Sequence, residues 1–105
     1  NYADEKFFSS NKIKLLFFST SMSCHCTLEM CKKQTIEILN LAKEKNLDYW
    51  IIDSYEHNEL QIKYETLFSP AVVVFDERNK VLLKIEYDEN LFPKLSEFIK
   101  TKLKG

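Results

Sequence analysis

Apolar positions along the chain alternate between runs typical of strands and spacings typical of helices. Successive apolar residues within 12–20, from Leu15 to Phe18, predict a strand that is buried on both faces. Residues 26–45 contain neither glycine nor proline, and their apolar side chains recur at helical spacing. We expect the inner face of this long helix to carry Leu28, Cys31, Thr35, Ile38, Leu39 and Ala42.

The remaining segments complete an α/β pattern. Further strands are predicted over residues 48–53, 71–75 and 81–87, and short helices over 3–9 and 58–66. The four residues 76–79 form a turn, so the last two strands should pair as an antiparallel hairpin. A final helix opens after residues 88–90, and its inner face should carry Leu95, Phe98, Ile99 and Leu103. We expect one α/β domain over residues 1–105.

Composition narrows the possible partners. Of the 105 residues, 45% are hydrophobic, which is enough for one core. Because 15 basic and 16 acidic residues nearly cancel, we expect neither nucleic acid nor an anionic membrane as a partner. No apolar run in the sequence approaches the roughly 20 residues that a membrane-spanning helix needs. We also expect the protein to be a monomer. The only glycine is Gly105, which excludes glycine-rich phosphate loops.

The three cysteines, Cys24, Cys26 and Cys31, are clustered. Disulfides across such short loops would gain little loop-closure entropy, so the cluster indicates chemistry rather than a structural staple. The chain begins at Asn1 without a leader, which favours a processed, extracytoplasmic domain, and its richness in Lys, Ile and Asn favours a bacterial source.

Cys24 and Cys26 lie at the predicted start of the long helix. There, unpaired N–H groups and the positive end of the helix dipole lower the pKa of a thiol. His25 between them could add positive charge or move a proton. A Cys24–Cys26 bond would close a tight ring and should be labile. Cys31 lies about 10 Å along the helix from Cys24, a distance that does not suit a disulfide. Because a free cysteine packs as a small apolar side chain, we expect Cys31 to be buried, with a role as a third thiol left open.

The order of elements resembles thioredoxin over nearly the whole chain. The cysteines follow the first strand, and Ser69-Pro70 opens the third, where that family carries a cis-proline packed against its redox motif. The resemblance implies the thioredoxin fold, a central four-stranded mixed sheet flanked by helices. The family motif is Trp-Cys-x-x-Cys. If its second cysteine falls on Cys26, Met22 takes the Trp position and Ser23 the first cysteine.

The resemblance favours a thiol-disulfide oxidoreductase or isomerase that needs no cofactor. Cys24 would attack, Cys26 would resolve, and His25 would adjust the thiol pKa. Ser69 and Pro70 would align a protein thiol or disulfide substrate. On this interpretation both Cys24 and Cys26 are required for exchange.

Two other classes of function stay open. Thiolate and thioether ligands select copper(I), or zinc if an imidazole joins. The possible ligands are Cys24, His25, Cys26 and Cys31, with Met22 and Met30 nearby. Alternatively, the chain is a degenerate thioredoxin-like module without redox activity, which binds an extended peptide beside Ser69-Pro70.

Overall fold

The computed structural model describes residues 2–66 and 68–104. Its helices and strands follow the predicted order. They are α1 (Tyr2–Phe8), β1 (Lys14–Ser19), α2 (His25–Lys45), β2 (Asp48–Asp53), α3 (Asn58–Lys63), β3 (Ala71–Phe75), β4 (Val81–Glu86) and α4 (Leu91–Lys104). Helix α3 ends before the predicted residue 66, because Glu65 adopts a left-handed backbone conformation with φ 56° that cannot continue a helix.

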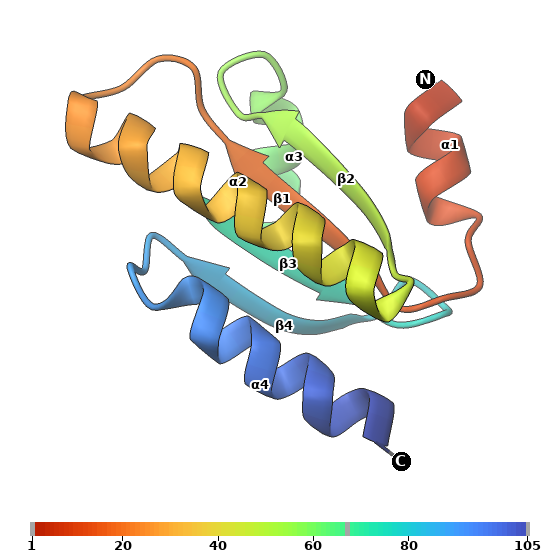
Figure 1. Cartoon of the computed structure of the whole chain (residues 1–105). Helices are drawn as coiled ribbons and strands as arrows, with labels where there is room; N and C mark the ends of the chain where they lie inside the picture. The colour runs from red at the N-terminus through yellow and green to blue at the C-terminus, as the bar shows by residue number, and fades with distance from the viewer. Residues whose placement is uncertain (1, 67, 105) are drawn as a thin grey trace.

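The four strands form one mixed sheet in the order β2-β1-β3-β4 (Figure 1). Strand β1 pairs in parallel with β2 and antiparallel with β3, and β3 pairs antiparallel with β4. This confirms the predicted four-stranded mixed sheet and its terminal hairpin.

Strand β1 is central and buried on both faces. Leu15 and Phe17 pack into a cluster beneath α2 and α4, whereas Leu16 and Phe18 pack on the opposite face with residues from α1 and α3. Figure 1 shows α2 and α4 in front of the sheet and α3 behind it. In the described residues, 2–66 and 68–104, no helix combines the length and apolarity needed to cross a membrane.

The set of residues predicted for the inner face of α2 is partly wrong. Leu39 is exposed, and two polar residues lie on the sheet side instead. Each has a partner within the chain: the Thr27 hydroxyl pairs with Tyr87, and Gln34 Nε2 donates to the carbonyl of Asp88 at 3.0 Å. The buried Gln34 Oε1 has no hydrogen-bond partner among the described residues. Apolar spacing alone misses such positions, because a buried polar side chain is tolerated wherever it has a partner. The buried side chains are Thr27, Cys31, Gln34, Ile38, Leu41 and Ala42. On α4, Leu103 is also more exposed than predicted.

A buried lysine begins β1. The Lys14 side chain is 0% exposed. Its amine donates to the carbonyl oxygens of Ser10 at 2.9 Å, Lys12 at 3.2 Å and Asp76 at 3.0 Å. Burial lowers the pKa of Lys14, although the carboxylates of Asp76, Asp48 and Glu77 oppose that shift. The amine therefore joins the segment before β1 to the β3–β4 turn.

We predict that Lys14→Ala lowers the free energy of unfolding by about 2–4 kcal/mol, because three carbonyls lose a donor and a cavity opens. Urea unfolding followed by the fluorescence of Trp50, the single tryptophan, measures the change. The exposed Lys33→Ala should change it by no more than about 0.5 kcal/mol. Equal effects of the two variants would contradict a structural role for the Lys14 amine.

Candidate functional site

The loop after β1 leads directly into the first turn of α2. Cys24 is the N-cap residue of this helix, with an extended backbone at φ −67° and ψ 160°. Its carbonyl accepts a hydrogen bond from the Leu28 N–H at 3.0 Å, which begins the helical pattern. The predicted start of α2 at residue 26 is therefore one residue late, and Cys24 stands where the helix exposes its unpaired N–H groups.

A chain of hydroxyl groups runs away from the Cys24 thiol. Cys24 Sγ lies 3.3 Å from the Thr27 hydroxyl oxygen, which lies 3.0 Å from the Tyr87 hydroxyl oxygen. Hydrogen bonding by the Thr27 hydroxyl, followed in size by that of the Thr27 backbone N–H, holds the pKa of Cys24 below the ordinary thiol value. Cys24 is also exposed. It is therefore an accessible thiol whose surroundings favour the thiolate.

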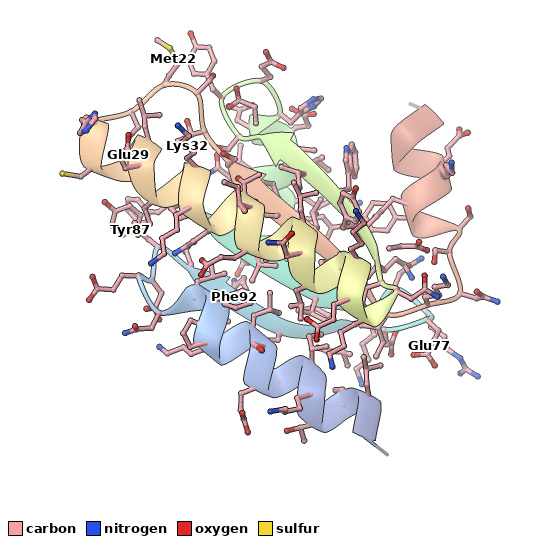
Figure 2. All side chains as sticks on the ribbon, viewed as in Figure 1. Met22, Glu29, Lys32, Glu77, Tyr87 and Phe92 are labelled. Carbon is pink, nitrogen blue, oxygen red and sulfur yellow. The ribbon has the colours of Figure 1, made fainter. Side chains whose placement is uncertain are left out.

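Tyr87 connects this chain to the loop before β3. It follows β4 with a left-handed backbone at φ 46°, which costs a residue with a side chain about 1 kcal/mol. Its N–H donates to the carbonyl of Pro70 at 2.8 Å. Its ring lies edge-on to that of Phe68, with centroids 6.2 Å apart. Figure 2 shows Tyr87 beside the N-terminal part of α2, with Met22 on the loop that precedes the helix.

The Ser69-Pro70 peptide bond is cis, as the resemblance implied. Both residues are buried, and the Ser69 hydroxyl lies 2.7 Å from that of Ser54 after β2. The loop after β1, the end of β2, the loop before β3 and the end of β4 thus meet at one end of the sheet. They enclose a pocket of about 630 Å³ lined by Thr20, Met22, Ser23, Cys24, Thr27, Ser54, Gln61, Phe68, Ser69 and Tyr87.

The other cysteine-cluster residues do not line this pocket. Cys26 is exposed two residues after Cys24, and side chains two apart on a helix do not face each other. His25 is exposed, with Nε2 4.0 Å from the Glu29 carboxylate. Cys31 is only 2% exposed, which confirms its predicted burial, and burial raises the pKa of its thiol. The structure places Thr27, rather than a second cysteine, against Cys24.

The side chains that the sequence offered as metal ligands do not come together in the structure. Within residues 2–66 and 68–104, no three His, Cys, Asp or Glu side chains are arranged to hold a metal ion. Cys31 lies in the core, while Cys24, His25 and Cys26 are on the surface.

Sequence reasoning missed two residues of the site. Thr27 follows Cys24 by three positions, and this spacing brings two helical side chains to the same face. The spacing alone is therefore enough to indicate the contact between Thr27 and Cys24. From the sequence, Tyr87 is predicted only as the last residue of the strand over 81–87. No local pattern indicated its role, because its contact with Thr27 joins residues 60 positions apart.

The sheet order, the helix on each side of β1 and the cysteine at the start of α2 define a thioredoxin-fold protein. The structure superposes on Fasciola hepatica thioredoxin with a TM-score of 0.75 and 22% identity, covering 95% of this chain and 92% of that one. A variant of Halobacterium salinarum thioredoxin gives a TM-score of 0.75 at 18% identity, covering 96% and 83%. The Drosophila thioredoxin Deadhead gives 0.69 at 20%, covering 92% and 90%. No protein-family model and no curated protein matches the sequence.

We predict that Cys24 is alkylated faster than Cys26, and that Cys31 is protected in the folded state. Because its pKa is lowered, Cys24 should reach half of its maximal rate at a pH below the ordinary thiol value of about 8.5. Neutral hydrogen bonds cause the shift, so added salt should hardly move this midpoint. Iodoacetamide labelling with peptide mass mapping measures each site. An unshifted or strongly salt-dependent midpoint would contradict this account of the thiol.

Proposed function

We propose that the protein catalyses thiol-disulfide exchange on protein substrates, with Cys24 as the attacking thiol. The observation that carries the proposal is the position of Cys24: it caps α2, is exposed, hydrogen-bonds Thr27, and opens on the pocket beside the Ser69-Pro70 loop. The thiolate is the nucleophile in disulfide exchange, and groups that favour it raise its concentration at neutral pH. The thioredoxin fold supports the same class of reaction.

The exchange proceeds through one mixed disulfide. The Cys24 thiolate attacks one sulfur of a substrate disulfide, so the substrate S–S bond breaks and its second sulfur leaves as a thiolate. Another substrate thiolate then attacks the substrate sulfur of the mixed disulfide, and the Cys24 thiolate is released. One disulfide is exchanged for another without net oxidation or reduction, which makes isomerisation the form of exchange that needs only Cys24 and the substrate.

The geometry of α2 favours this one-thiol form over the Cys24–Cys26 pair inferred from the sequence. A disulfide requires Cβ atoms about 3.8 Å apart and side chains directed toward each other. Cys26 lies two positions into the helix from Cys24, about 200° around its axis. A bond between them would require the first turn of α2 to change conformation. The site beside Cys24 is occupied by the Thr27 hydroxyl, which cannot resolve a mixed disulfide.

Apolar surface next to the thiol suits an unfolded or partly folded substrate. Met22 is 63% exposed and Phe68 is 62% exposed, and both line the pocket. The Pro70 carbonyl accepts the Tyr87 N–H, so this acceptor is engaged within the chain. We therefore place the substrate's apolar side chains against Met22 and Phe68, which orients a neighbouring disulfide toward Cys24.

We predict that Cys24→Ser abolishes isomerisation of a small protein with scrambled disulfides, because no attacking thiolate remains in the pocket. Cys26→Ser should retain most of the activity. Recovery of the native substrate in a glutathione buffer measures both variants. Loss of activity in Cys26→Ser as well as in Cys24→Ser would support the two-thiol assignment and contradict the one-thiol form. Full activity in Cys24→Ser would overturn the proposed function.

A gain-of-function variant tests the same geometry. Thr27→Cys places a second sulfur where the Thr27 hydroxyl now lies 3.3 Å from Cys24 Sγ, within reach of a disulfide after a small side-chain rotation. We predict a reversible bond between the two thiols in a glutathione titration, with reductase activity toward insulin that the parent protein lacks. The matched control, Thr35→Cys, adds a cysteine two turns further along α2 and should form no bond to Cys24. Absence of the bond in Thr27→Cys would contradict the described approach of the two side chains.

A further inference from the structure

Tyr87 contacts two parts of the site that are distant in the sequence. Through its hydroxyl it reaches Thr27 on α2, and through its backbone N–H it holds the Pro70 carbonyl. Its side chain is 49% exposed and lines the pocket beside Phe68. Figure 2 shows the side chain lying against the N-terminal part of α2. Tyr87 is therefore placed to link the substrate loop with the partner of the attacking thiol.

The hydrogen-bond chain has a single possible direction when Cys24 is ionised. A thiolate carries no proton, so it can only accept, and the Thr27 hydroxyl must donate to it. The Thr27 oxygen is then free to accept, and Tyr87 can donate its phenolic proton to it. Each bond in such a chain polarises the next and strengthens it. In the neutral thiol the chain can run in either direction, so this added stabilisation belongs to the thiolate.

We propose that Tyr87 is a positioning residue for the attacking thiol: its hydroxyl orients the Thr27 hydroxyl toward Cys24 and so stabilises the reactive thiolate. The inference rests on the proposed role of Cys24 in exchange and adds the residue that prepares it. The left-handed backbone at Tyr87, with φ 46°, fits this role, because a strained conformation is retained where the surrounding structure requires it.

No charged side chain of the described residues lines the pocket, so the hydrogen bonds from Thr27 and Tyr87 are the main influence on the ionisation of the Cys24 thiol. Among the described residues that line the pocket, none is an aspartate, glutamate, lysine or arginine, and the titratable groups are Cys24 and Tyr87. On α2 itself, His25 and Glu29 pair with each other at 4.0 Å. After β4, Asp88 is paired with Lys94. Removing one hydroxyl should therefore change the thiol without altering a nearby charge.

The test is the pH profile of Cys24 alkylation by iodoacetamide, with peptide mass mapping to separate it from Cys26. Tyr87→Phe keeps the ring against Phe68 and removes only the hydroxyl. We expect its midpoint to move to higher pH, so that the Cys24 rate at neutral pH falls about two- to fivefold. Thr27→Val should move the midpoint further, because it removes the direct donor, and Thr27→Ser should restore it. Tyr49→Phe, on β2 outside the pocket, should match the parent protein.

An unchanged midpoint in Tyr87→Phe, in a sample whose unfolding midpoint is also unchanged, would overturn the inference. So would a shift of the same size in Tyr49→Phe. Because alkylation needs no protein substrate, its result is independent of the exchange assay. If Cys24→Ser retains isomerase activity, the proposed function fails even where Tyr87→Phe moves the profile. If isomerisation depends on Cys24 and Tyr87→Phe leaves the profile unmoved, only the positioning role fails.

Discussion

The fold depends on the burial of β1 from both sides. A strand with large apolar side chains on both faces must be covered by two layers, and here α2 and α4 cover one face while α1 and α3 cover the other. The crossover from β1 through α2 to the parallel strand β2 follows from the same requirement. Since β1 ends where the crossover begins, the residues just after it necessarily lie at one end of the sheet. That is where Cys24 begins the helix.

Helical geometry then decides which side chain lies next to the Cys24 thiol. Positions three apart on a helix share a face, whereas positions two apart are turned away from each other. The sequence Cys24-His25-Cys26-Thr27 therefore presents a sulfur and a hydroxyl to each other and leaves the second sulfur outside the pocket. A cysteine at position 27 would face Cys24 and could form a disulfide with it, whereas the cysteine at position 26 does not face Cys24.

Much of the fold could be predicted because its determinants are local. The continuous apolar run at 15–18, the uninterrupted helical stretch and the short turn at 76–79 each specify an element within a few residues. The position of the candidate site could be predicted as far as Cys24 and the Ser69-Pro70 loop, because a family pattern marks both. The rest could not, because Thr27 and Gln34 are polar residues whose burial depends on partners at Tyr87 and Asp88, far along the chain.

The buried thiol of Cys31 has a consequence for the dynamics of the protein. It lies on the buried side of α2, with 2% of its surface exposed, and burial raises its pKa. A reagent can reach it only when that part of the helix leaves the sheet, so its modification rate reports how often this opening occurs. The rate of Cys31 modification therefore measures the local opening of the helix that also carries Cys24. Because Cys31 does not line the pocket, this measurement leaves the pocket unchanged.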